Sequence, residues 1–115
     1  MGDINLVPVE GGVGIEIQDI DLSKDLSDSI FSDIKQAFVK HGLIFFRNQH
    51  LTPHEHIKFA TRWGLININR FFTKVKGYDQ IAEVRKEGDQ KVNIGGEWHT
   101  DHSYDQIPAM GSILL

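Results

Sequence analysis

The chain of 115 residues contains no cysteine, which excludes disulfide bridges, thiolate zinc centres and cysteine-ligated iron–sulfur clusters. It also lacks an apolar run near the ~20 residues that a helix needs to cross a membrane. The first five residues have neither the basic nor the apolar segment of a secretory signal peptide. We therefore expect a cytoplasmic protein without membrane association.

Positive charge is also scarce. Twelve Lys and Arg residues stand against sixteen Asp and Glu residues, so the formal net charge is −4. This balance does not favour binding to nucleic acid or to an anionic membrane surface. The apolar and charged fractions, 40% and 24%, are those of a soluble globular protein, and the length suits one domain.

Two segments have the pattern of amphipathic helices with matching end signals. Ser27 can cap a helix that Gly42 ends. Its apolar face recurs at helical spacing and consists of Ile30, Phe31, Ile34, Ala37 and Phe38. The second helix begins at Thr52, with Pro53 at the first helical position and Glu55 closing a capping box, and Gly64 stops it.

Apolar alternation and apolar runs predict strands between and after these helices. The glycine-rich turn at 11–14 precedes the alternating residues 15–17, which predicts an edge strand. The continuous apolar run 43–46 is typical of a strand buried on both faces. Residues 81–85 predict a further strand, and residues 112–115 begin an apolar one. These elements together predict an α+β protein.

A histidine and an aspartate two residues apart, His99 and Asp101, are the candidate metal ligands. On a strand these side chains project from the same face, so an imidazole nitrogen and a carboxylate oxygen can hold one cation. A third ligand from elsewhere would complete a two-histidine, one-carboxylate site with open positions, which suits iron-dependent oxygen chemistry.

Spacing alone leaves other interpretations open. A solvated strand end, with His99 and Asp101 paired to each other, explains the same pattern. Glu97 shares their face and is the best rival ligand, whereas His102 fits a position outside the ligand set. The histidines at 50, 54 and 56 fit a solvated first helical turn, because positions two apart on a helix point away from each other.

Several separated motifs resemble the N-terminal half of the taurine dioxygenase family, which includes 2,4-dichlorophenoxyacetate dioxygenase. The motifs run from His41 to Gln49, from Leu51 to Gly64, from Trp98 to Asp101 and from Pro108 to Leu115. The resemblance implies a double-stranded β-helix (jelly roll, cupin-like) with flanking helices. It implies Fe(II) as cofactor and 2-oxoglutarate as cosubstrate, with release of succinate and CO2.

On this resemblance, His99 and Asp101 match the first two iron ligands. The third ligand, a distal histidine, and the arginine that pairs with 2-oxoglutarate would follow Leu115. We therefore expect residues 1–115 to be the N-terminal part of a single dioxygenase domain. Asn69 and Asn93 are the candidate substrate contacts. Gly95 replaces an asparagine of taurine-type members, so taurine is not favoured over another small acid.

The expected function is therefore hydroxylation of a small, anionic organic substrate with 2-oxoglutarate and O2. The alternative is a non-catalytic jelly-roll binding domain that keeps the fold without the iron chemistry. A metal-independent, oligomerising chain is a third alternative, and homo-oligomerisation stays open.

Overall fold

The structure is a computed structural model that describes residues 4–66, 68, 73–84, 88–89, 91, 97–98, 106 and 109–115. The chain divides into two compact units, Met1–His56 and Ile57–Leu115. Helices and strands occur together, so the α+β expectation is confirmed at this level. No helix in the described part of the chain has the length and apolar character of a membrane span.

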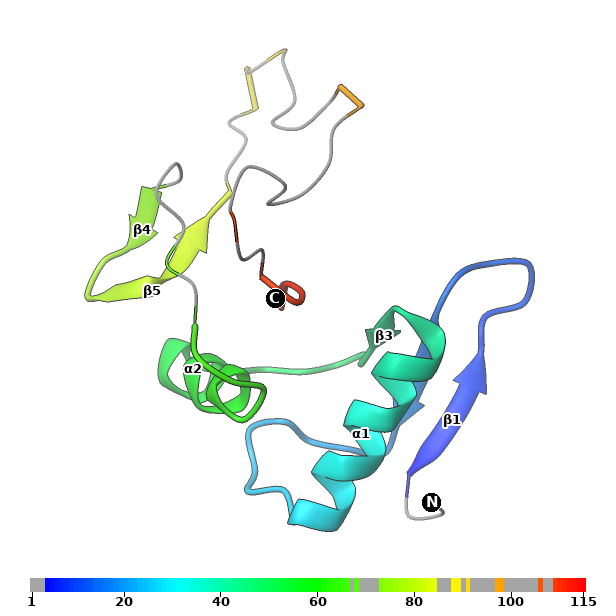
Figure 1. The fold of residues 1–115 in the computed structure, drawn as a ribbon. Coiled ribbons are helices and arrows are strands. Elements are labelled where there is room, and N and C mark those ends of the chain that lie inside the picture. Colours follow the sequence, from blue (N-terminus) through cyan, green and yellow to red (C-terminus); the bar gives the residue numbers. More distant parts are fainter. Residues whose placement is uncertain are drawn as a thin grey trace. The chain divides into compact units, whose positions relative to one another are not determined.

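The first unit contains a three-stranded sheet, in the order β1-β2-β3 (Figure 1). β1 (Asn5–Pro8) and β2 (Ile15–Gln18) form an antiparallel hairpin, and β3 (Ile44–Phe45) pairs with β2 in parallel. The glycine-rich turn predicted at 11–14 joins β1 to β2. Gly11 and Gly14 have φ values of 69° and 92°, a conformation that glycine adopts without steric penalty.

The prediction of an edge strand at 15–17 was wrong, because β2 lies in the middle of this sheet. Ile15 and Ile17 are buried as the alternation predicts, but Glu16 between them is also buried, with 9% of its surface exposed. The alternation suggested that the Glu16 face was open to water. Polar side chains cover that face instead, and they satisfy the carboxylate with hydrogen bonds.

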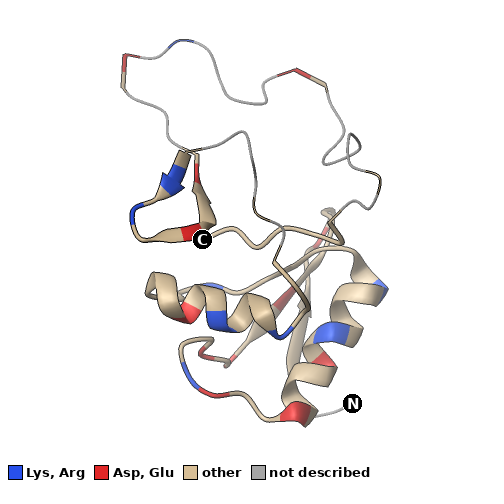
Figure 2. Ribbon diagram, turned by 60° about the vertical axis from the view of Figure 1, so that its left-hand side comes forward, with Lys and Arg blue, Asp and Glu red and all other residues tan. Residues whose placement is uncertain are grey.

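Helix α1 (Asp28–His41) contacts β2 and β3. Its predicted ends are confirmed: the Ser27 hydroxyl accepts a hydrogen bond from the Ile30 N–H, and Gly42 ends the helix with φ 77°. Ile34 and Ala37 of the predicted apolar face are 0% and 1% exposed. Figure 2 shows acidic residues near the start of α1 and basic residues near its end, which complements the helix dipole.

The apolar run 43–46 forms a strand, but a shorter and less buried one than predicted. β3 contains only Ile44 and Phe45, both half-buried, and Leu43 is 49% exposed. In the described sheet β3 pairs only with β2, so no described strand covers its other edge. A strand needs neighbours on both edges and layers on both faces to be fully buried.

Helix α2 (Pro53–Thr61) confirms the predicted start at atomic detail. The Thr52 N–H donates to the Glu55 carboxylate at 2.9 Å, and the Glu55 N–H donates to the Thr52 hydroxyl at 3.2 Å. These reciprocal bonds are a capping box. The helix ends at Thr61, and a turn then leads to Gly64, whose φ is 138°.

The second unit contains an antiparallel hairpin of β4 (Thr73–Val75) and β5 (Tyr78–Glu83), joined by a turn at Gly77. β5 overlaps the strand predicted at 81–85 but begins three residues earlier, and β4 was not predicted. The apolar strand predicted from residue 112 was wrong, since 111–115 have no regular structure. Leu114 and Leu115 are 89% and 72% exposed, and no described strand pairs with this segment.

Candidate functional site

The four site residues predicted from the sequence, His99, Asp101, Asn69 and Asn93, all lie outside the described residues. Their roles therefore stay predictions, and His102 lies outside the described part as well. Two residues directly before His99 are described. Glu97, the rival ligand, is exposed and lies at a bend, and Trp98 is fully exposed.

The side chains of His99 and Asp101 offer one imidazole nitrogen and one carboxylate group to a metal ion. A neutral imidazole and a carboxylate are two of the three ligands of the facial Fe(II) site found in oxygenases, so His99 and Asp101 fit that ion by residue type. In the described ranges, no three His, Asp or Glu side chains are grouped in a way that could hold a metal ion. Of the described histidines, His50 and His54 are exposed, and His41 and His56 are half-buried.

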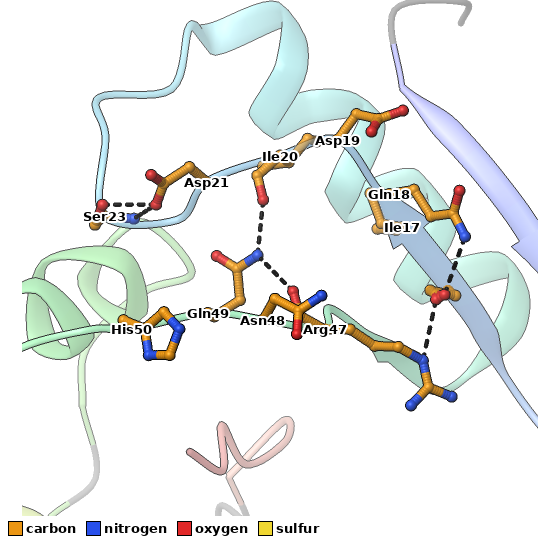
Figure 3. A pocket seen from close by; sticks show the side chains of 11 residues that line it. Ile17, Gln18, Asp19, Ile20, Asp21, Ser23, Arg47, Asn48, Gln49 and His50 are labelled. Carbon is orange, nitrogen blue, oxygen red and sulfur yellow. Dashed lines mark hydrogen bonds and ion pairs between the residues drawn. The ribbon is translucent and has the colours of Figure 1, made fainter.

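The described residues do form one polar groove, of about 620 Å³, between the loop after β2 and the loop after β3 (Figure 3). Both loops belong to the first unit. Asp19 and Asn48, one on each loop, have φ values of 63° and 58°. Non-glycine residues rarely adopt this left-handed conformation, and Asp and Asn tolerate it best.

Gln49 holds the two sides of this groove together. Its side-chain oxygen accepts a hydrogen bond from the Leu22 N–H at 2.8 Å, and its amide nitrogen donates to the Ile20 carbonyl at 2.8 Å. The same nitrogen donates to the Arg47 carbonyl at 3.1 Å (Figure 3). Both ends of the amide bond to backbone, so Gln49 satisfies polar backbone groups of the loop after β2 and of its own loop.

Glu16 and Arg47 form an ion pair along the groove, with 3.3 Å between Nε and the carboxylate. The Gln18 amide donates to the other Glu16 oxygen at 3.1 Å, and the Arg47 guanidinium lies 5.2 Å from the centre of the Phe45 ring. The Glu16 side chain is only 11% exposed, whereas that of Arg47 is 71% exposed. The arginine therefore compensates a buried carboxylate, which would otherwise carry a desolvation cost.

Asp21 lies at the end of the groove where its loop turns toward α1. The Ser23 hydroxyl and the Ser23 N–H donate to its carboxylate at 2.6 and 2.9 Å. These hydrogen bonds, chiefly that of the hydroxyl, lower the pKa of Asp21 below its ordinary value of 3.8. Lys24 and His50 lower the pKa further.

The groove therefore supports the fold more than it prepares a reaction. Its buried carboxylate is compensated by Arg47, and the Gln49 amide is saturated with backbone partners. The sequence placed Gln49 only at the end of the motif 41–49 and did not identify it as a bridge. No local pattern indicated this role, because its backbone partners at 20 and 22 are distant in the sequence.

Comparison with known proteins identifies the family. Residues 5–115 match the family model described as taurine catabolism dioxygenase TauD, TfdA family. The chain is 27% identical to an (S)-phenoxypropionate/alpha-ketoglutarate-dioxygenase of Sphingobium herbicidovorans over 115 residues, 96% of the chain and 39% of the relative. It is 31% identical to an alpha-ketoglutarate-dependent sulfate ester dioxygenase of Pseudomonas putida, covering 97% and 36% of the two chains.

Solved structures agree with this match. A taurine dioxygenase from Burkholderia xenovorans aligns with a TM-score of 0.60 and 28% identity, over 66% of this chain and 28% of its own. A crystal structure named as a putative alpha-ketoglutarate-dependent taurine dioxygenase from the same organism gives a TM-score of 0.61 and 29% identity, over 67% and 28%. The chain thus spans well under half the length of these relatives. It belongs to the TauD/TfdA family of dioxygenases.

Proposed function

We propose that this chain is part of an Fe(II)- and 2-oxoglutarate-dependent dioxygenase that hydroxylates a small, anionic organic substrate. The observation that carries the proposal is the family match over residues 5–115, which includes the His99-x-Asp101 pair. Relatives whose names include a sulfate ester, a sulfonate and a phenoxypropionate all take substrates with an acid group, which supports an anionic substrate here.

In this proposal His99 and Asp101 supply two iron ligands, and Asn69 and Asn93 contact the substrate. The fold of the complete domain is a double-stranded β-helix with flanking helices, and residues 1–115 form its N-terminal part. The described hairpins and helices are compatible with that arrangement. The contacts of Gln49 and Arg47 in the polar groove support the scaffold.

The reaction balances with one molecule of O2. Oxidative decarboxylation of 2-oxoglutarate to succinate and CO2 takes up one oxygen atom, and conversion of a C–H bond to C–OH takes up the other. Bound Fe(II) supplies the redox chemistry that activates O2, and it needs open coordination positions for its cosubstrates. The part of this chain is to hold the metal with one imidazole and one carboxylate, both of which must be deprotonated.

The test uses the full-length protein under anaerobic conditions. Fe(II) and 2-oxoglutarate should together produce the visible absorption of a metal-bound keto acid, and air should then yield succinate. His99→Ala and Asp101→Ala should abolish the absorption and lower succinate formation at least 100-fold, because each removes a direct ligand. His54→Ala and Asp79→Ala are matched controls at exposed described positions and should change neither readout.

Wild-type absorption and succinate formation in both ligand variants would contradict the assignment of His99 and Asp101. A wild-type protein that binds an organic acid but neither Fe(II) nor 2-oxoglutarate would instead favour the non-catalytic binding domain.

A further inference from the structure

We draw no further inference here: the strongest candidate, the polar groove between the loops after β2 and β3, holds the carboxylates of Glu16 and Asp21 in hydrogen bonds to its own residues, and nothing in the described part of the chain shows what ligand it would take.

Discussion

The two compact units of the chain differ in how far their apolar side chains are buried. In the first unit Ile15, Ile17 and Ile34 are at most 4% exposed, so sheet and helix close a core from their own side chains. In the second unit Leu65 and Leu114 are 104% and 89% exposed. Six of the seven buried apolar side chains among the described residues belong to the first unit, with Phe59 as the exception, whereas the predicted metal ligands belong to the second unit. Most of the described core and the predicted metal ligands therefore belong to different parts of the sequence.

The largest expected effect is on the core of the first unit. Ile34→Ala should lower the free energy of unfolding by about 2 to 5 kcal/mol, because Ile34 is fully buried and its removal leaves a cavity. Chemical denaturation followed by circular dichroism measures the change. Val39→Ala on the same helix, where Val39 is 76% exposed, and Leu114→Ala in the second unit should each change it by less than about 0.5 kcal/mol. A large loss in Leu114→Ala would remove the contrast between the units.

A smaller effect should separate two glycines of the first unit that share the left-handed conformation. Gly42→Ala should cost about 1 to 2 kcal/mol, because a methyl group meets no atom there and only the backbone is strained. Gly14→Ala should cost more, since its methyl group would lie 2.8 Å from the Leu43 carbonyl oxygen. That oxygen already accepts a hydrogen bond from the Ile15 N–H at 3.0 Å. Equal losses of stability in the two variants would mean that β3 shifts away from the added methyl group at no cost in free energy.

The smallest effect concerns Asp21, an exposed carboxylate whose pKa the Ser23 hydrogen bonds lower. A carboxylate with a lowered pKa stabilises the fold above its unfolded-state pKa, and this contribution is lost as the pH falls through the folded-state pKa. Ser23→Ala should therefore raise the Asp21 pKa toward 3.8. It should also weaken the dependence of the free energy of unfolding on pH below about pH 4. NMR titration measures the pKa, and Ser32→Ala, at an exposed position of α1, should leave it unchanged.

Local signals predicted the helices well. Ser27, Gly42 and the Thr52–Glu55 capping box end or begin helices where the sequence indicated, because a cap involves backbone groups only a few residues away. Strand positions were less predictable. Alternation placed Ile15 and Ile17 inside correctly, but it could not show that β3 would pair beside β2 and that Glu16 would be buried.

The candidate site was also predicted from local signals. His99 and Asp101 were chosen for their donor chemistry and their place in the family motifs, and those choices stay predictions because the residues lie outside the described part.

The sequence by itself determined the family, the helix boundaries and the identity of the candidate iron ligands. These follow from residue type and short-range spacing, which the chain carries whatever its fold. Only the tertiary structure decided that β2 is central, that Gln49 bonds to the backbone of a loop 29 residues away, and that Glu16 is buried beside Arg47. Each of these features depends on contacts between segments that are distant in the sequence. Such contacts decide which groups are buried and which hydrogen bonds they form.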